Sequence, residues 1–559
     1  MQADLPDTVG ALVAGGVSQR VAILLARRGI ETPAEADEFL SPSLDQLHDP
    51  HGLPGLTRAV DRLLAGREQR EKVAVVGDYD VDGVSATALL VAAMRACGLE
   101  ARGILPERLK EGYGIQPMHV DMASEQGCKL VVTADCGSTA LDAMGRAEEL
   151  GIDVIVTDHH LGDSVMLPEQ VIEVNPHRAD STYPFPHLSG VGVAFKLATA
   201  LLAKADRTFD ERALLRVACL GTICDLVPLV GENRVIAAAG LAALAETRSA
   251  GLIALMERAS VKPPVTAVDV GFRIGPRINA AGRLGSPQPA LDLLLSTDRA
   301  EAVRLAENLD GWNRQRQSTE IRVFEQAEEE FAALPELPPI LVGWNEDWHP
   351  GVLGIAAGRI ARIFHRPTIL LHPKGEQAKG SGRSVPRIHL FDFLSGWREE
   401  YERFGGHAQA VGLTVSRESL EDLRQRWQAA AAAKWPPDLL VKDYRYELEI
   451  APKEVVQSLL EEFGQLEPFG MDNRQPVLRV GPLSLSGQPR RFGRNHLAVQ
   501  ATGADGGRVE LLGWGWQERE EDLQGTFEVL ATVDRDRYHG GPVLRLIDAR
   551  ALADGPAPD

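Results

Sequence analysis

Residues 73–87 read Val-Ala-Val-Val-Gly-Asp-Tyr-Asp-Val-Asp-Gly-Val-Ser-Ala-Thr, and this stretch decides the fold. A short apolar run ends in three carboxylates at alternate positions, Asp78, Asp80 and Asp82, and a helical pattern follows. That order is typical of a strand that enters a helix through a tight turn. Such closely spaced aspartates repel one another unless a cation lies among them. The stretch therefore predicts a site for a metal ion or an arginine, with a solvated acidic turn as the simpler alternative.

Two later segments repeat the pattern of an apolar run that ends in acidic or imidazole groups. Residues 129–134 lead to Asp135, and residues 153–157 lead to Asp158-His159-His160. Helical patterns lie between the runs, which predicts a parallel sheet covered by helices on both faces. In such a sheet the strand C-termini meet at one edge. Helix capping explains one terminal Asp, but three such strand ends favour a shared site.

The mixture of ligand types indicates which metal the site would take. Carboxylate with imidazole suits a divalent transition ion such as manganese better than magnesium alone. One carboxylate shared between two ions would hold them about 3.5–4 Å apart, an arrangement used for displacement at phosphorus. Asp225 follows a further apolar stretch, residues 214–223, and is either another ligand or a turn residue.

Four motifs resemble the DHH phosphoesterase superfamily, and more closely its RecJ family of bacterial single-strand-specific 5′-to-3′ DNA exonucleases. The motifs are residues 77–83, 135–137, 158–160 and 221–228. The resemblance covers nearly the whole chain. It implies hydrolysis that releases 5′-mononucleotides with two divalent metal ions, manganese or magnesium.

The resemblance also implies roles for individual residues. Asp80 and Asp82 would ligate one ion each, Asp135 would bridge the ions, and His159 and Asp225 would complete the second site. Asp78 is implied either as a ligand or as a group that orients one. Asp158 would orient a histidine or cap its loop, and His160 would contact the scissile phosphate.

Substrate-binding groups are expected in two arginine-containing segments of the first half. Residues 106–114 resemble a family segment and place Arg108 on a phosphate, although a charged surface loop is the alternative. Residues 271–285 are rich in glycine and contain Arg277, Asn279 and Arg283. We expect a mobile turn whose planar donors bind DNA phosphates; helix capping or ion pairing to the acidic motifs is the alternative.

Residues 188–192 are a glycine-rich start of a helix that either binds an anion or packs closely.

The second half contains two more candidate segments, which resemble the DHH-associated domain. Ser381, Arg383 and Ser384 offer a phosphate-binding nest. Gly405 and Gly406 permit close backbone approach, and His407 supplies a donor in a Gly-Gly-His turn that the resemblance places facing the metal site.

The expected fold class is α/β, with two α/β lobes joined by a long helix and followed by an OB-fold β-barrel. Capping at Asp298 and Glu301 starts the long helix, and short alternating segments from residue 444 onward predict the barrel. The boundaries are an N-terminal helical cap 1–48, a DHH catalytic domain 49–295, a connecting helix 296–335, a DHH-associated domain 336–437, an OB-fold domain 438–552 and a tail 553–559.

Cationic and aromatic side chains of the barrel offer backbone neutralisation and base stacking for a single strand, although its tryptophans can instead be core. They are Arg490, Arg491, Arg494, His496, Trp514, Trp516, Arg535, Arg537 and Tyr538.

Composition sets weaker limits. The formal net charge of −20 argues against nucleic-acid binding, but a long chain can hold a local basic groove. The five cysteines show no paired spacing, and the N-terminus has no signal-peptide pattern. We expect a cytoplasmic monomer without a membrane span. Its partners would be single-stranded DNA with a 5′ end and, from the resemblance, single-strand-binding protein and a recombination helicase.

Two alternatives remain at this stage. One is a DHH phosphoesterase on short RNA oligomers, cyclic dinucleotides or pyrophosphate, and the other is a non-catalytic DNA-binding scaffold. Whether a further domain follows residue 559 is left open.

Overall fold

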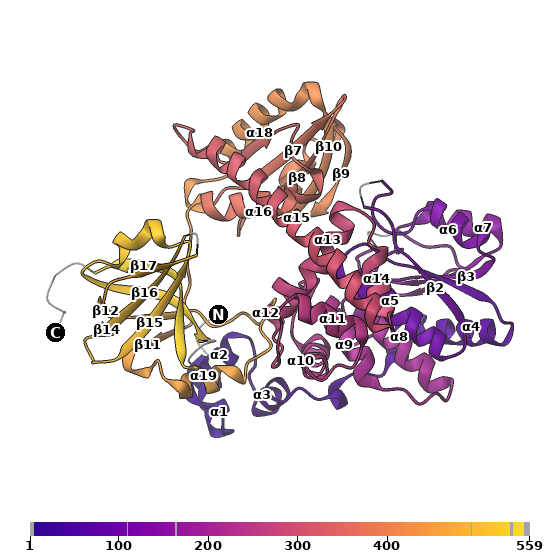
Figure 1. Cartoon of the computed structure of the whole chain (residues 1–559), viewed down its shortest axis with the longest axis horizontal. Coiled ribbons are helices and arrows are strands. Elements are labelled where there is room, and N and C mark those ends of the chain that lie inside the picture. Colours follow the sequence, from indigo (N-terminus) through magenta and orange to yellow (C-terminus); the bar gives the residue numbers. More distant parts are fainter. Residues whose placement is uncertain (1–4, 109, 163–164, 494, 537–539, 553–559) are drawn as a thin grey trace.

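The computed structural model describes residues 5–108, 110–162, 165–493, 495–536 and 540–552. They form three bodies at the corners of a triangle: a first lobe, a second lobe and a barrel (Figure 1). The predicted tail, residues 553–559, lies outside the described residues. The predicted class of two α/β lobes, a long helix and an OB-type barrel is confirmed.

The first lobe is built on a five-stranded parallel sheet with strand order β2-β1-β3-β4-β5. Successive side chains of its strands point to opposite faces of the sheet, and each face has a hydrophobic core of its own. Val73 and Val75 pack with the helices of one face, whereas Ala74 and Val76 pack with those of the other. The strands are β1 (Lys72–Val76), β2 (Glu100–Ile104), β3 (Cys128–Thr133), β4 (Asp153–Thr157) and β5 (Ile172–Val174).

Helices cover both faces of this sheet, as the alternation predicts. One face carries α4 (Leu56–Glu68), α5 (Val81–Ala96) and α8 (Gly190–Lys204), and the other carries α6 (Pro117–Glu125) and α7 (Leu141–Leu150).

A helical layer extends the first lobe and has a core of its own against α5. Among the described residues no single helix is long and apolar enough to cross a membrane; only α10 and α11 together meet such a test, with an 87° bend between them. The layer comprises α9 (Glu211–Cys224), α10 (Gly231–Ala245), α11 (Ala250–Arg258), α12 (Ala267–Asp269), the π-helical turn η3 (Val270–Ile274), α13 (Gly275–Leu284) and α14 (Gln288–Leu295).

The long helix α15 (Arg299–Ala332) has 34 residues and joins the two lobes (Figure 1). Asp298 caps it by accepting a hydrogen bond from the Glu301 amide, as predicted. The second lobe contains a mixed sheet of order β6-β7-β8-β10-β9. Its elements are β6 (Leu341–Trp344), α16 (Leu353–Phe364), β7 (Thr368–Lys374), β8 (Gln377–Arg383), α17 (Leu390–Ser395), β9 (Tyr401–His407), β10 (Ala410–Ser416) and α18 (Leu420–Lys434).

Five strands close the C-terminal barrel, because β12 pairs with both β16 and β14 and the chain β16-β17-β15-β14 completes the circuit. Two short strands lie outside the closed barrel: β11 pairs with β12, and β13 pairs with β14. The elements are β11 (Leu448–Ile450), α19 (Gln457–Gly464), β12 (Leu478–Leu485), β13 (Arg490–Phe492), β14 (His496–Gly503), β15 (Arg508–Trp514), β16 (Thr526–Arg535) and β17 (Pro542–Ala551).

The N-terminal helices pack on the barrel, far along the chain from their own sequence position. Buried side chains of α1 (Leu5–Ala14), α2 (Gln19–Arg27) and α3 (Pro33–Leu40) share one core with residues 448–546. The helices of residues 5–40 and the described part of residues 448–551 therefore form one body, which sequence proximity could not indicate.

Two local predictions are wrong. Residues 271–285 are helical rather than a mobile turn, because Pro276 fits the first turn of α13 and the small residues permit close packing, with Gly282 against the Tyr79 carbonyl. Gly405, Gly406 and His407 belong to strand β9 and not to a turn, because β9 pairs with β10 up to His407 and the hairpin bend falls at residues 408–409.

Candidate active site

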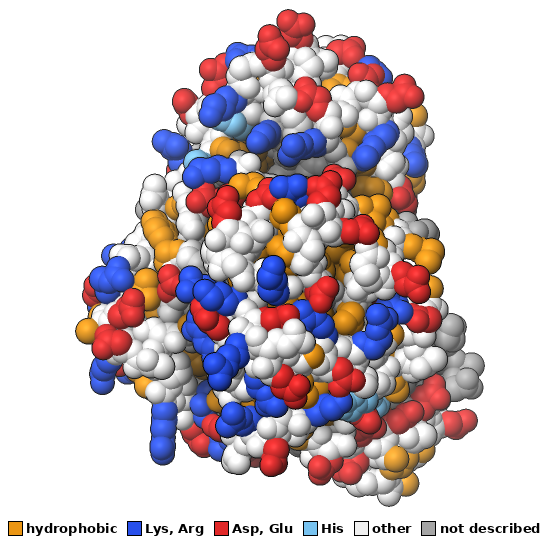
Figure 2. Space-filling view, turned by 90° about the vertical axis from the view of Figure 1, so that its right-hand side faces the viewer, with side chains coloured by type: hydrophobic (Ala, Val, Ile, Leu, Met, Phe, Trp, Pro, Cys, Tyr) orange, Lys and Arg blue, Asp and Glu red, His pale blue; other side chains and the backbone are white. Residues whose placement is uncertain are grey.

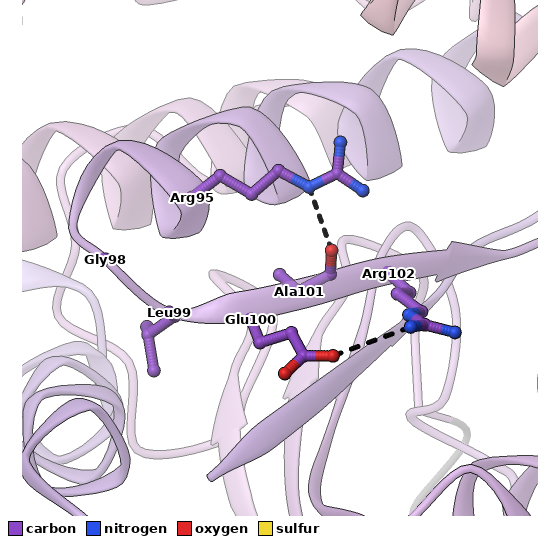
Figure 3. Close-up of a pocket in the computed structure, with 6 residues that line it drawn as sticks. All are labelled: Arg95, Gly98, Leu99, Glu100, Ala101 and Arg102. Atoms are coloured by element: carbon purple, nitrogen blue, oxygen red, sulfur yellow. Dashed lines mark hydrogen bonds and ion pairs between the residues drawn. The ribbon is translucent and has the colours of Figure 1, made fainter. Parts of the chain in front are cut away.

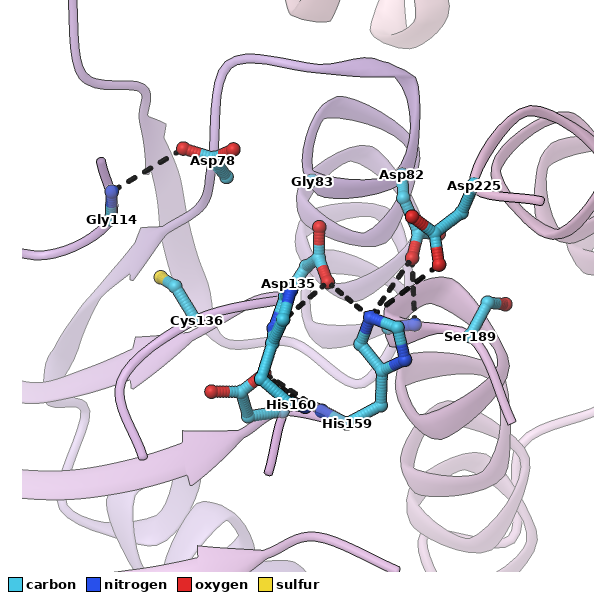
Figure 4. Close-up of polar contacts among 12 residues, drawn as sticks. Asp78, Asp82, Gly83, Gly114, Asp135, Cys136, His159, His160, Ser189 and Asp225 are labelled. Carbon is cyan, nitrogen blue, oxygen red and sulfur yellow. Dashed lines mark hydrogen bonds and ion pairs between the residues drawn. The ribbon is translucent and has the colours of Figure 1, made fainter. Parts of the chain in front are cut away.

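The acidic groups after the first-lobe strands converge on His159 (Figure 4). Its Nε2 atom lies 3.2 Å from Asp135 Oδ1, 3.5 Å from Asp225 Oδ2 and 3.9 Å from Asp82 Oδ2. Asp225 arrives from the C-terminal end of α9, a helix of the other layer. The parallel sheet and the helical layer thus supply one shared cluster.

Backbone amides and one helix terminus orient the carboxylates of the opening stretch. Asp80 is the N-cap of α5 and accepts hydrogen bonds from its first amides. Asp82 accepts from Gly190 N at 2.7 Å and Val191 N at 3.0 Å. The sequence left open whether the glycine-rich start of α8 binds an anion or only packs closely. Its amides bind a carboxylate, and that carboxylate is Asp82 of the same chain.

Glycine is required where the backbone passes the carboxylates. A Cβ at Gly190 would lie 2.3 Å from Asp135 Oδ1, and a Cβ at Gly221 would lie 2.3 Å from Asp82 Oδ1. Asp135 itself has φ of +64°, an uncommon conformation for a side-chain-bearing residue. Main chain and carboxylates are thus packed as closely as the atoms allow.

The cluster retains protons because it is buried and uniformly acidic. Burial, then the charge of Asp80, raises the pKa of Asp82 to about 7. Burial, then the charge of Asp82, raises the pKa of Asp225 to about 9. Burial also raises the pKa of Asp135 well above its usual value. Burial, with His160 nearby, lowers the pKa of His159 to about 4, so its ring is neutral at physiological pH.

These residues fit a divalent cation. Asp135 Oδ1 and His159 Nε2 are buried atoms that lack a hydrogen-bond partner among the described residues. Two overlapping sets of ligand atoms, Asp135-His159-His160 and Asp82-His159-Asp225, are each compact enough to hold an ion. Neutral imidazole and carboxylate oxygens are donors that manganese accepts. Asp78 lies apart from both sets and accepts a hydrogen bond from Gly114 N at 3.3 Å.

His160 is held as a cation by Asp158. Its Nδ1 donates to Asp158 Oδ1 at 2.8 Å. Burial alone would lower the pKa of His160, but this hydrogen bond together with the charges of Asp158, Asp225 and Asp82 outweighs burial and raises the pKa to about 9. Burial would likewise raise the pKa of Asp158, yet the His160 contact lowers it to about 2. Asp158 also accepts from three main-chain amides, which fixes the pair.

Two tyrosines of the site were missed by sequence reasoning. The Tyr113 hydroxyl lies 3.1 Å from His160 Nδ1 and donates to the Asp135 carbonyl at 3.2 Å. Tyr79 contacts Tyr113 edge-on, and the Arg108 guanidinium lies 5.0 Å from the Tyr79 ring centre. The signal was present, because Tyr79 lies between two of the aspartates and Tyr113 between the glycines of residues 112–114.

Arginines from three elements gather beside the acidic cluster. Burial, followed by the charges of Arg108, Arg316 and Arg383, lowers the pKa of Arg283 to about 10. Arg283 also donates to the Gly351 carbonyl at 3.4 Å, which joins α13 to the second lobe. Arg316 is paired with Glu320 at 2.7 Å, and the positive charge of the other three arginines would attract an anion to this place.

Ser381 shares the surroundings of Arg383. A Cβ at Gly354, in the first turn of α16, would lie 2.8 Å from Arg383 Nη2 and 3.0 Å from Ser381 Oγ. Serine and guanidinium groups therefore approach the start of a helix together, which is a suitable surrounding for a phosphate.

Other predicted substrate residues lie elsewhere or are already engaged. Arg277 pairs with Asp310 of α15 at 2.9 Å, which agrees with the ion-pairing alternative although its partner is outside the acidic motifs. The Ser384 hydroxyl donates to the Ile388 carbonyl at 2.7 Å. Asn279 is half-buried on α13, and Gly405, Gly406 and His407 are exposed on β9.

On the barrel, Trp514 is 46% exposed, whereas Trp516 is 4% exposed and belongs to the core. The Arg545 guanidinium lies 4.8 Å from the Trp514 ring centre, and Phe492 and His496 contact the same ring. Arg490 lies over Phe492 at 5.8 Å. We call Arg490, Phe492, His496, Trp514 and Arg545 the aromatic face. Of the other predicted residues, Arg491 pairs with Glu520, while Arg494, Arg537 and Tyr538 lie outside the described residues.

A hollow at the start of β2 lies at the end of the sheet opposite the acidic cluster, and in it Arg95 donates to the Ala101 carbonyl while Arg102 pairs with Glu100 (Figure 3). On the face shown in Figure 2, basic and acidic side chains are interspersed. The net charge of −20 is thus not spread as a uniform acidic surface there.

Three family models match the chain in the order of its domains. They are the DHH family N-terminal domain at residues 72–222, the DHHA1 domain at residues 337–433 and the RecJ OB domain at residues 446–547.

Similar curated proteins carry the name single-stranded-DNA-specific exonuclease RecJ. The chain is 35% identical to that of Bacillus subtilis over 511 residues, covering 91% of this chain and 64% of the relative. It is 34% identical to that of Escherichia coli over 527 residues, covering 87% of this chain and 91% of the relative. This chain thus spans less than two thirds of the Bacillus protein.

Solved structures agree with the sequence matches. RecJ of Thermus thermophilus in complex with Mn2+ superposes with a TM-score of 0.82 at 30% identity and covers 100% of this chain and 80% of its own. A RecJ exonuclease bound to manganese gives a TM-score of 0.61 at 34% identity, covering 70% of this chain and 97% of its own.

Proposed function

The chain belongs to the RecJ family, and on that premise we propose that it is a 5′-to-3′ exonuclease specific for single-stranded DNA. It would release 5′-mononucleotides by metal-dependent hydrolysis, in DNA repair and recombination. The observation that carries the proposal is the convergence on His159 of Asp82, Asp135 and Asp225, with ligand atoms left unpaired.

Two divalent ions would be held by this cluster, with manganese preferred and magnesium accepted. Structures of the Thermus relative contain Mn2+ and Mg2+. Asp80, Asp82, Asp135, His159 and Asp225 would be the ligands, with Asp78 as a lesser candidate. Bound ions supply hydroxide at neutral pH and neutralise negative charge at phosphorus.

His160 and Asp158 would act on the scissile phosphate. With a pKa of about 9, His160 is protonated at neutral pH and can donate to a phosphate oxygen. Asp158 holds the ring through Nδ1, so Nε2, which lies 3.3 Å from the Tyr113 hydroxyl, would be the atom that donates to the substrate. Tyr113 would restrict the ring's rotation through its contact at 3.1 Å.

The 5′ end of the strand would lie among Arg108, Arg283 and Arg383. Burial, followed by the charges of the neighbouring arginines, lowers the pKa of Arg283, and a terminal phosphate would offset that repulsion. Ser381 offers a hydroxyl beside Arg383. Because this group lies next to Asp80, a strand held by its end presents its first phosphodiester to the acidic cluster. Exonuclease rather than endonuclease cleavage follows from that geometry.

Further contacts are proposed from the resemblance. Asn279, Ser384, Gly405, Gly406 and His407 would line the path of the terminal nucleotide. Arg277 would act through its pair with Asp310, which fixes α13 to the long helix.

The aromatic face of the barrel would guide the incoming strand by base stacking and backbone neutralisation. Its exposed Trp514 ring beside Arg545 supports this role. Single-strand-binding protein and a recombination helicase are proposed as partners, and a change in the rate of strand degradation when either purified protein is added would test this.

Product analysis tests the activity. Strands of about 40 nucleotides, labelled at either end, as single- or double-stranded DNA or RNA, would be incubated with manganese or magnesium. We expect mononucleotides from single-stranded DNA only, starting at the 5′ end. Turnover of a dinucleotide but not of the long strand would instead identify a phosphoesterase of short substrates, and binding without cleavage in either metal would identify a scaffold.

A further inference from the structure

Arg234 lies at a joint between the first lobe, the N-terminal helices and the barrel body. It belongs to α10 of the first lobe and is 2% exposed. Its Nε donates to the Phe39 carbonyl at 2.7 Å. Its two Nη atoms donate to the four carbonyls of residues 465–468, at 2.8 to 3.5 Å. The five N–H groups of one guanidinium thus match five main-chain oxygens that belong to another body.

Burying this charge is costly, and the surroundings offset the cost without a carboxylate contact in the described residues. Residues 465–468 follow the C-terminus of α19, where carbonyls point outward and the helix dipole is negative. The Phe39 ring lies 3.9 Å from the guanidinium carbon. Burial lowers the pKa of Arg234 to about 10, so it remains charged at neutral pH.

Neighbouring contacts strengthen the same joint. Leu229 N donates to the Met471 carbonyl at 2.9 Å, and a Cβ at Gly470 would lie 2.5 Å from Leu229 Cδ1. Within the barrel body, the fully buried Asn473 orders the segment that Arg234 binds, because it donates to two of the same carbonyls and accepts from Arg28 Nε at 3.1 Å. These contacts join the barrel body to the first lobe in addition to the connecting chain.

We propose that Arg234 is a positioning residue that fixes the distance between the aromatic face and the acidic cluster. This inference rests on the proposed function. A strand long enough to reach both sites gains affinity because the second contact is intramolecular, and that gain depends on a fixed separation. Loosening the joint lowers the effective concentration of one site for the other and leaves the acidic cluster intact.

The test separates binding of the long strand from chemistry. In Arg234→Gln, the KM for a single strand of about 40 nucleotides should rise by roughly tenfold while kcat stays within about twofold. Arg234→Lys keeps the charge but has only three donors, so its KM should lie between the two. Arg216→Gln is the matched control, because Arg216 is also largely buried and caps the Ala243 carbonyl, but within the first lobe.

Small-angle X-ray scattering without DNA supplies a readout that needs no activity. The radius of gyration of Arg234→Gln should increase as the barrel body loosens, while that of Arg216→Gln should not. Should Arg234→Gln fail to fold, Gly470→Ala places a Cβ 2.5 Å from Leu229 Cδ1 across the same joint and should raise KM in the same direction. Unchanged KM and scattering, or a fall in kcat at constant KM, would overturn the inference. A wild type that does not cleave the strand refutes the proposed function instead, and the scattering then still decides on the joint.

Discussion

A single added methyl group at Gly190 should disable the acidic cluster. The Cβ of Gly190→Ala would lie 2.3 Å from Asp135 Oδ1 and 2.6 Å from its Cγ, whereas real Cβ contacts stay above 3.0 Å. The Asp135 carboxylate must therefore shift by about 0.7 Å, unless α8 moves. Moving α8 would disturb Asp82 instead, since Gly190 N holds that carboxylate at 2.7 Å. Either response displaces a proposed metal ligand.

The size of the loss follows from the shift. Groups at a reacting centre must be held to within about 0.5 Å, and a misplacement near 1 Å costs about a hundredfold in rate. We expect kcat of Gly190→Ala to fall by roughly a hundredfold, or about 2.7 kcal/mol of barrier. Overpacking should lower the free energy of unfolding by about 1–3 kcal/mol.

The assay follows mononucleotide release from end-labelled single-stranded DNA with manganese, and anisotropy measures DNA binding separately. The control is Gly145→Ala on helix α7, where a Cβ meets nothing within 4 Å. Since alanine favours a helix, that variant should keep full activity and gain a little stability. Wild-type kcat in Gly190→Ala would refute the placement of Asp135 at the reacting centre.

Three further predictions test the ligands, the strand end and the electrostatics. Asp135→Asn should abolish cleavage while DNA affinity is kept, and isothermal titration should find weaker manganese binding; cleavage by this variant in manganese would contradict the assignment. Wild type should have a lower KM for strands with a 5′-phosphate than for strands with a 5′-hydroxyl, and in Arg383→Gln this KM ratio should shrink by roughly ten- to a hundredfold. An unchanged ratio would exclude Arg383 from the strand-end site. In the folded state the pKa values of Asp82, Asp225 and His160 are raised to about 7, 9 and 9, respectively. The folded protein therefore binds more protons than the unfolded chain. Its free energy of unfolding falls as the pH rises through these values. Melting in a chelator should therefore drop between about pH 7 and pH 9 and recover with manganese, whereas a flat profile would show that these groups are not buried together.

The sequence indicated those parts of the site that local pattern controls. Each of Asp82, Asp135 and His159 follows directly after a strand or opens a helix, so alternation of elements was enough to bring them to one edge. Asp225 was open to two interpretations from the residues alone, because a turn aspartate has the same local pattern. Its contact with His159 at 3.5 Å depends on how the helical layer packs on the sheet.

The features that the sequence did not predict depend on contacts between distant segments of the chain. The partner of Arg277 is Asp310, 33 residues away on the long helix, and nothing near residues 271–285 indicates it. Gly405 and Gly406 suggest a turn by composition, yet the ladder with β10 extends through both. The joint at Arg234 is the extreme case, since its acceptors lie 195 to 234 residues away.

The acidic cluster and the joint at Arg234 illustrate opposite ways of handling buried charge. At the joint, one cation is matched by main-chain oxygens, so the folded state itself satisfies it. In the cluster, burial leaves Asp135 Oδ1 and His159 Nε2 unpaired, and the protons retained by Asp82 and Asp225 compensate only partly for the repulsion. A bound divalent cation would take the place of those protons and would supply a partner for both unpaired atoms. Metal binding should therefore contribute to the stability of the first lobe as well as to catalysis, and a gain in melting temperature with manganese should disappear in Asp135→Asn.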